Sequence, residues 1–106
     1  VDAWVRKGVT LDETGDYHEA CACFNKAIKL SPGSFKAYYN RGKCRMNQNL
    51  IDEAIADFDK ATSLSPKNAS AHERFGQALA KAGREEEAEL QFAIAAQLRK
   101  NKKKGE

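Results

Sequence analysis

The sequence predicts an all-α fold of antiparallel helix pairs, and three observations support this prediction. Residue types recur every 34 positions along the chain of 106 residues. Within each interval, small and apolar residues fall at steps of three and four, which places them on one face of a helix. Each interval also holds two groups of turn-forming residues, so each copy is expected to contain two helices.

The repeat is visible at seven positions that keep one residue type in all three copies. These positions hold glycine, phenylalanine, alanine, leucine or glutamate. They are Gly8, Gly42 and Gly76; Phe24, Phe58 and Phe92; Ala3, Ala37 and Ala71; Ala20, Ala54 and Ala88; Ala27, Ala61 and Ala95; Leu30, Leu64 and Leu98; and Glu19, Glu53 and Glu87. Such regularity indicates an internal repeat in which each copy is one supersecondary unit.

The expected helices follow from this period. In the second helix of the first copy, Ala20, Phe24 and Ala27 lie on one face, together with Leu30. Gly8 and Ala20 are small enough to let the two helices of a pair approach closely, and Phe24 fills the space beside them. The predicted helices span residues 2–14, 17–30, 35–48, 51–64, 69–82 and 85–100.

Turn residues separate the two helices of each pair. Gly15, Asn49 and Gly83 follow the same period, and these residue types tolerate the left-handed backbone that ends a helix. Asp16, followed three residues later by Glu19, predicts a capping box at the start of the second helix.

Other residues separate one pair from the next. Pro32 and Pro66 end the preceding helix, because proline disfavours helical backbone in the residue before it. Ser34 and Asn68 are then placed to cap the helix that follows.

This pattern resembles the tetratricopeptide repeat, whose signature places an aromatic residue, glycine, alanine, phenylalanine and proline at fixed offsets. Trp4 and Tyr38 hold the aromatic position of the first two copies. The third copy has His72 there, which we expect to be a packed core histidine, and it has Lys100 in place of proline. Such departures are typical of a terminal repeat.

The resemblance implies an architecture and domain limits. Helix pairs stack into a right-handed α-solenoid, whose first helices line a concave groove and whose second helices form the outer wall. In register the copies cover residues 1–34, 35–68 and 69–102, so we expect three repeats over residues 1–98. Residues 99–106 are expected to form a basic C-terminal tail.

The distribution of charge argues against a specific nucleic-acid surface. The formal net charge is +3, but residues 99–106 carry five of the 18 basic side chains and one of the 15 acidic ones. The rest of the chain is therefore close to neutral, which does not fit a broad nucleic-acid interface. No apolar run approaches the ~18 residues that a membrane span needs.

The sequence shows no pattern of catalytic residues. No histidine pairs with a plausible nucleophile, and there is no glycine-rich phosphate loop and no metal-ligand spacing. We therefore expect no enzyme activity, no cofactor and no metal. Cys21, Cys23 and Cys44 are odd in number, which favours free thiols in a reducing compartment, and Cys21 is expected to pack as a small buried residue. We expect a cytoplasmic protein, with the nucleus as an alternative.

The candidate binding residues are side chains of the first helices that project into the groove. We expect the groove to hold an extended or helical segment of a partner protein, in an adaptor or scaffold role. An apolar side chain of the partner would lie near Val5, Val9 and Tyr39, with a carboxylate toward Lys43 and Arg74. The predicted groove residues are Val5, Val9, Lys36, Tyr39, Asn40, Lys43, Arg74 and Gln77, flanked by Asp12, Ser70 and Glu73.

The last helix carries a second candidate surface. Leu90, Ile94 and Leu98 form an apolar stripe at steps of four. At the first two of these positions the earlier copies have alanine or lysine, which indicates a face exposed to water. An exposed stripe predicts a contact with a second copy of the chain, with a further repeat, or with a ligand protein.

Two further functions stay open. One is that of a structural spacer in a longer solenoid whose contacts are made by other repeats. The other comes from a branch of the family that clamps the C-terminal carboxylate of heat-shock chaperones with lysine, asparagine and arginine side chains. Asn40 and Arg74 match that set, whereas Val5, Val9 and Ser70 replace its other members, so chaperone-tail binding is the minor alternative.

Overall fold

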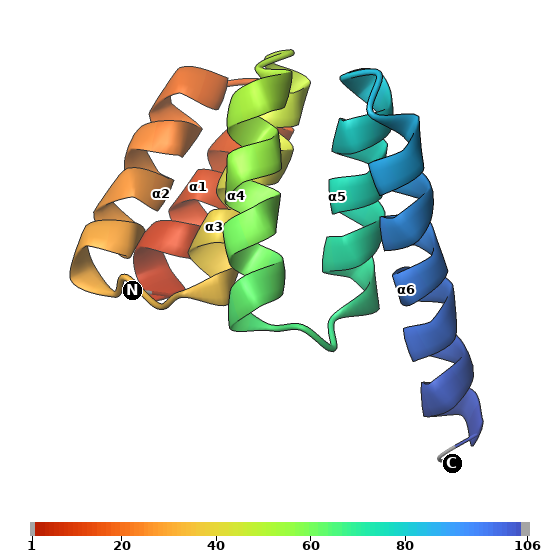
Figure 1. Ribbon diagram of the computed structural model, residues 1–106. Coiled ribbons are helices and arrows are strands. Elements are labelled where there is room, and N and C mark those ends of the chain that lie inside the picture. The colour runs from red at the N-terminus through yellow and green to blue at the C-terminus, as the bar shows by residue number, and fades with distance from the viewer. Residues whose placement is uncertain (1, 105–106) are drawn as a thin grey trace.

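The computed structural model describes residues 2–104, with side chains through residue 101. The described residues form six α-helices and no strand (Figure 1). The helices are α1 (Asp2–Glu13), α2 (Tyr17–Leu30), α3 (Phe35–Asn47), α4 (Ile51–Leu64), α5 (Ala69–Lys81) and α6 (Glu85–Lys104). The predicted all-α fold is confirmed, and the helix ends agree with prediction to within one residue except at the end of α6.

The helices pack as three antiparallel pairs that stack side by side (Figure 1). α1 packs on α2, α3 on α4, and α5 on α6. Consecutive pairs meet where α2 contacts α3 and where α4 contacts α5. The first helices also contact one another, α1 with α3 and α3 with α5, so they line one side of the stack. This is the predicted solenoid of helix pairs.

A glycine facing a phenylalanine sets the spacing inside each pair. A Cβ atom added to Gly8 would lie 2.5 Å from the ring of Phe24, and one added to Gly42 would lie 2.8 Å from the ring of Phe58. Both rings are fully buried. The predicted close approach of the two helices is therefore confirmed, because only a residue without a side chain leaves room for the ring.

The turns and caps follow the prediction at most positions. Gly15, Asn49 and Gly83 have φ angles of 88°, 62° and 81°, in the left-handed region that ends a helix. Ser34 accepts a hydrogen bond from the backbone N–H of Ala37 at 3.2 Å, and Asn68 accepts one from Ala71 at 3.0 Å. These side chains satisfy backbone donors that the start of a helix leaves free.

Two local predictions are wrong. The Asp16–Glu19 capping box does not form, because Asp16 has φ −85° and ψ 60° and makes no side-chain cap hydrogen bond. Its carboxylate instead accepts a hydrogen bond from the Thr14 hydroxyl at 3.1 Å. Leu30, expected on the buried face, is 63% exposed, because it is the last residue of α2 and the chain turns away after it.

The basic residues near the end of the chain continue the last helix. Residues 99–104 continue α6, which extends past the start of α5 in Figure 1. Residues 105–106 lie outside the described part of the chain. The basic residues that follow Leu98 therefore begin as part of the last helix.

The glycine–phenylalanine contact can be tested with an alanine substitution. Overpacking a rigid core costs about 1–3 kcal/mol, and alanine recovers about 1 kcal/mol of helix propensity. A Cβ atom 2.5 Å from the Phe24 ring corresponds to the upper end of that cost, so we expect Gly8→Ala to lower the free energy of unfolding by about 2 kcal/mol in urea denaturation, after this balance.

Gly33→Ala is the matched control. A Cβ atom at Gly33 would meet no atom within 4 Å, and Gly33 does not have a positive φ angle. This variant should unfold at the wild-type urea concentration or slightly above it. Equal stability of the Gly8 and Gly33 variants would contradict the packing account.

Candidate peptide-binding groove

A hollow between α1 and α3 coincides with the first part of the predicted groove. It has a volume of about 460 Å³, and its lining residues are Asp2, Val5, Arg6, Val9, Thr10 and Lys36. Val5 is buried and packs in the core around Phe24, so it forms the floor of the hollow, whereas Val9 is half-buried. Three of the predicted groove residues, Val5, Val9 and Lys36, thus share one depression.

The middle part of the predicted groove lies on α3. Tyr39 stacks on Phe35 with ring centroids 5.4 Å apart, and its edge meets Phe58 at 6.1 Å. Tyr39 is half-buried, so it supports the fold as well as presenting a ring edge. Lys43 places its ammonium group 5.7 Å from the Tyr39 ring centroid. Asn40 donates a hydrogen bond to the Lys36 carbonyl at 2.8 Å, which uses part of its amide within the same helix.

The last part of the groove lies on α5. Arg74 and Gln77 are exposed. Glu73, which we expected beside them, is bound by Arg99 of α6 at 2.8 Å. This hydrogen bond and the positive charge of Arg99 lower the pKa of Glu73. The Arg99 guanidinium therefore already pairs with Glu73, which is one of the acidic groups expected in the groove.

Three basic side chains of the predicted groove are not paired with an acidic side chain of the described residues. Among the described side chains, Lys36, Lys43 and Arg74 form no salt bridge with an acidic residue. A bound carboxylate would therefore not have to displace an internal partner. Cation–carboxylate hydrogen bonds are stronger than neutral ones, so unpaired cations of this kind are chemically suited to acidic groups.

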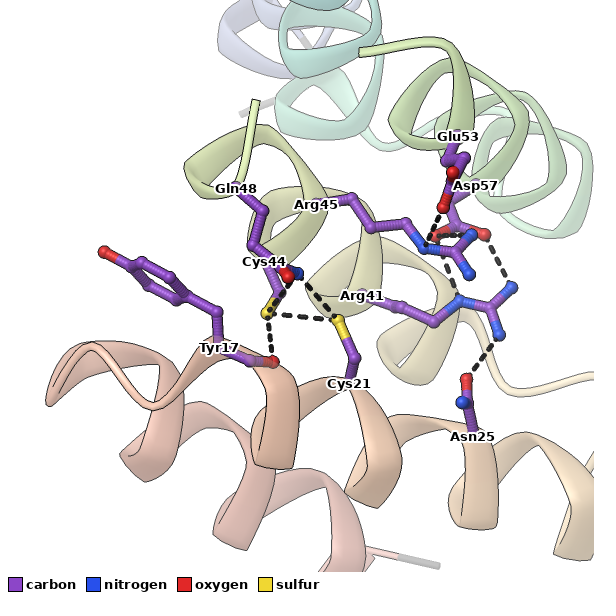
Figure 2. A network of polar contacts seen from close by, with 9 residues as sticks. All are labelled: Tyr17, Cys21, Asn25, Arg41, Cys44, Arg45, Gln48, Glu53 and Asp57. Atoms are coloured by element: carbon purple, nitrogen blue, oxygen red, sulfur yellow. Dashed lines mark hydrogen bonds and ion pairs between the residues drawn. The ribbon is translucent and has the colours of Figure 1, made fainter. Parts of the chain in front are cut away.

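A buried ion-pair network holds α3 against its neighbours (Figure 2). Asp57 of α4 has a side chain only 3% exposed, and it accepts hydrogen bonds from Arg41 at 2.7 and 3.0 Å and from Arg45 at 3.0 Å. Arg41 also donates to Asn25 of α2 at 2.8 Å, and Arg45 lies 3.6 Å from Glu53. The network thus joins three helices across two repeats.

The electrostatics of this network favour full ionisation of Arg41. Burial is the largest influence and would lower the pKa of Arg41, but the hydrogen bond and negative charge of Asp57 outweigh it and raise that pKa. Every buried side-chain nitrogen or oxygen among the described residues has a hydrogen-bond partner. The charges are therefore compensated, as buried ions require.

Sequence reasoning missed this network. The available signal was an aspartate on a buried helix face where the first copy has Cys23 and the third has Gln91. The partners of Asp57 could not be identified from the sequence, because Arg41 and Arg45 lie on the preceding helix, 16 and 12 residues away.

His72 behaves as predicted for a packed histidine. It is 8% exposed, and its Nε2 lies 2.8 Å from the carbonyl oxygen of Pro66. Its Nδ1 lies 2.7 Å from Oε1 of Gln91 on α6. His72 therefore links the loop before α5 to α6, in place of an aromatic ring.

The stripe on α6 reaches the surface. Leu90 is 58% exposed, and Ile94 and Leu98 are half-buried. Leu98 also belongs to a second hollow, of about 640 Å³, whose lining residues are Lys67, Asn68, Ala69, Ser70, Leu98, Arg99 and Asn101. Phe92 is 38% exposed, unlike the buried phenylalanines of the first two pairs. Among the described helices, α6 thus carries two large exposed apolar side chains, whereas α2 carries one, Leu30, and α4 none.

The comparisons with known proteins agree with this architecture. Two tetratricopeptide repeat family models match residues 1–34 and 35–68. The chain therefore belongs to the tetratricopeptide repeat family. Comparison with curated protein sequences gives no match.

Several solved structures of MamA resemble the chain. A crystal structure of MamA has a TM-score of 0.93 and 25% identity, over 97% of this chain and 60% of that chain. MamA of strain MSR-1 has a TM-score of 0.83 and 26% identity, over 90% and 55%. A form of MamA from Desulfovibrio magneticus RS-1 has a TM-score of 0.89 at 22% identity, over 93% and 56%. The chain spans about 60% of the length of the first of these.

None of the described helices combines the length and the apolar character needed to cross a membrane. Within the same part of the chain, no group of three or more His, Cys, Asp and Glu residues is arranged to hold a metal ion.

The contribution of the buried network can be measured by neutralising Asp57. Asp57→Asn leaves Arg41 and Arg45 without their counter-ion. Removal of one partner of a buried pair costs about 3–5 kcal/mol, and we expect about 2–3 kcal/mol here because both guanidinium groups retain some water. Urea denaturation should therefore show a lower midpoint with a similar slope.

Glu87→Gln is the matched control, since it makes the same chemical change in an exposed pair. Glu87 binds Arg84 at 2.6 Å, and both side chains are about half exposed. Exposed pairs contribute little, so no measurable change in stability is expected. Equal midpoints for the Asp57 and Glu87 variants would show that the network does not stabilise the fold.

Proposed function

We propose that this chain binds a segment of a partner protein in the groove formed by α1, α3 and α5, and acts as an adaptor or scaffold. Tetratricopeptide repeats serve as protein-interaction modules, and the family membership supports this general role. The observation that carries the specific proposal is the hollow beside Val9 and Lys36, together with the basic side chains of Lys43 on α3 and Arg74 on α5. A cytoplasmic location belongs to the same proposal, supported by the odd number of cysteines.

The side chains suggest the chemistry of the partner. An apolar side chain fits the hollow over Val5 and beside Val9, while acidic side chains fit the line of Lys36, Lys43 and Arg74. Tyr39 adds the exposed part of its ring between these two regions. We therefore expect an extended or helical segment with one apolar anchor and a run of carboxylates.

Chaperone-tail binding remains the minor alternative. Asn40 and Arg74 are the two matching residues, but the Asn40 amide already donates to Lys36, and Val5 is buried. A terminal carboxylate would then lack several of the charge-assisted bonds that such a clamp needs. Titration of a short acidic peptide with a free C-terminus decides this point, since micromolar binding would restore the alternative.

The groove can be tested by reversing the charge of two of its basic side chains. We expect Lys43→Glu with Arg74→Glu to weaken binding of the partner segment at least about tenfold, because two charge-assisted hydrogen bonds of about 1.5–3 kcal/mol each would be lost. Tyr39 is left unchanged in this variant, because its removal would also disturb Phe58. Partners are first captured with the wild-type chain, and affinity is then measured by calorimetry.

The control is Lys29→Glu with Lys60→Glu. These lysines are exposed on α2 and α4, so the net charge changes equally while the groove is untouched. The control should bind as the wild type does. A partner that the groove variant and the control bind equally well would contradict the groove assignment.

Self-association through α6 is a second candidate function, favoured by the 58% exposure of Leu90. The helix begins with Glu85, Glu86 and Glu87 and carries Arg99 and Lys100 near its other end. Two antiparallel copies of α6 would therefore pair acidic with basic ends around the apolar stripe. The alternatives are a further repeat packed on α6 or a spacer role in a longer solenoid.

Sedimentation at increasing concentration tests this second candidate. Burial of a leucine contributes at most about 2–3 kcal/mol, so a weak, concentration-dependent dimer is expected. Leu90→Lys with Ile94→Lys should abolish it, whereas Ala22→Lys with Ala56→Lys, exposed alanines on α2 and α4, should not. A wild-type chain that stays monomeric at high concentration would exclude the dimer.

A further inference from the structure

Two cysteine sulfurs meet at the interface between the first and second repeats (Figure 2). Cys21 of α2 and Cys44 of α3 are 23 residues apart in sequence, and their Sγ atoms lie 3.3 Å apart. The prediction that Cys21 is a small buried packing residue is wrong in one respect. Cys21 is only partly buried, because it lies at the edge of the interface, whereas Cys44 is fully buried.

The next interface shows what simple packing looks like at this place. One repeat later, the positions of Cys21 and Cys44 hold Ile55 and Ala78, both buried apolar residues of α4 and α5. Both belong to one cluster of buried apolar residues, where their side chains pack without a hydrogen bond of their own. The two thiols of the first interface have, in addition, a set of hydrogen bonds that packing alone does not need.

These hydrogen bonds distinguish the two thiols. The Gln48 amide donates to Cys21 Sγ at 3.3 Å and approaches Cys44 Sγ at 3.8 Å. The Cys44 thiol donates to the Tyr17 carbonyl at 3.3 Å. Burial raises the pKa of the Cys44 thiol, and the neighbouring Cys21 and Asp12 raise it further. Cys44 therefore keeps its proton, while Cys21 is partly exposed to solvent and accepts the Gln48 N–H hydrogen bond.

We propose that Cys21 and Cys44 form a reversible intramolecular disulfide when the chain meets hydrogen peroxide. In the first step the Cys21 thiol loses its proton, its sulfur attacks one peroxide oxygen, the O–O bond breaks, and Cys21 sulfenic acid forms. The hydroxide that is released takes up the lost proton and becomes water. In the second step the Cys44 sulfur attacks the Cys21 sulfur, the S–O bond breaks, and the Cys44 proton leaves with the hydroxyl group as water. Two thiols are oxidised and one peroxide is reduced to two water molecules.

The product requires only a small local movement. A disulfide has an S–S distance of about 2.05 Å, so the two sulfurs must approach by little more than about 1 Å. The bond would tie α2 to α3 and fix the first repeat against the second. A thiol such as glutathione would reverse it by exchange at the partly exposed Cys21.

Mass spectrometry of the chain before and after peroxide treatment tests the proposal. The oxidised chain should lose the mass of two hydrogen atoms, its free-thiol count should fall from three to one, and peptide mapping should join Cys21 to Cys44. Its melting temperature should rise by roughly 10 °C, because the cross-link restricts the unfolded chain. Dithiothreitol should restore the original mass, thiol count and melting temperature.

Two variants test which of the three cysteines form the disulfide. Cys23→Ala removes the third cysteine, which is buried and forms no hydrogen bond with either sulfur of the pair, so the cross-link should still form. Cys21→Ser should leave two thiols that peroxide does not link. The proposal is overturned if the wild type keeps three thiols, if Cys21 gains oxygen atoms without cross-linking, or if the bond joins Cys23 or two separate chains.

Discussion

The close approach of two helices at a glycine is the constraint on which the rest of this structure depends. In each pair the glycine of the first helix leaves room for the phenylalanine of the second, at Gly8, Gly42 and Gly76. The contact fixes both the spacing of the pair and its rotation, and so decides which face of each first helix points away from the core. The groove is the result, because α1, α3 and α5 present equivalent faces on one side of the stack.

The three pairs share this constraint but differ in what surrounds it. Between the first and second pairs lies a thiol contact, inside the second lies the Asp57 ion-pair network, and the third has a partly exposed Phe92. Polar groups thus fill places that apolar side chains take elsewhere in the same register. Such groups contribute modest stability but define which partners a helix can have, since an uncompensated buried charge is costly.

The sequence was informative where a feature is local or periodic. The period located the helices, the left-handed turns at Gly15, Asn49 and Gly83, and the caps at Ser34 and Asn68, because each depends on neighbouring residues. It was uninformative about contacts between distant side chains, such as Arg99 with Glu73 and Cys21 with Cys44. The groove residues are an intermediate case. The repeat register predicts the helix face on which they lie, but it does not predict the burial of Val5 or the packing of Tyr39.

The central claim is that the first helices form the binding face. Nuclear magnetic resonance of the ¹⁵N-labelled chain, titrated with the partner segment, tests it most directly by reporting every backbone amide at once. If the first helices bind the segment, the shifted amides will cluster around Val9, Lys36, Lys43 and Arg74 on α1, α3 and α5. Shifts confined to the outer faces of α2 and α4, or to α6, would contradict it.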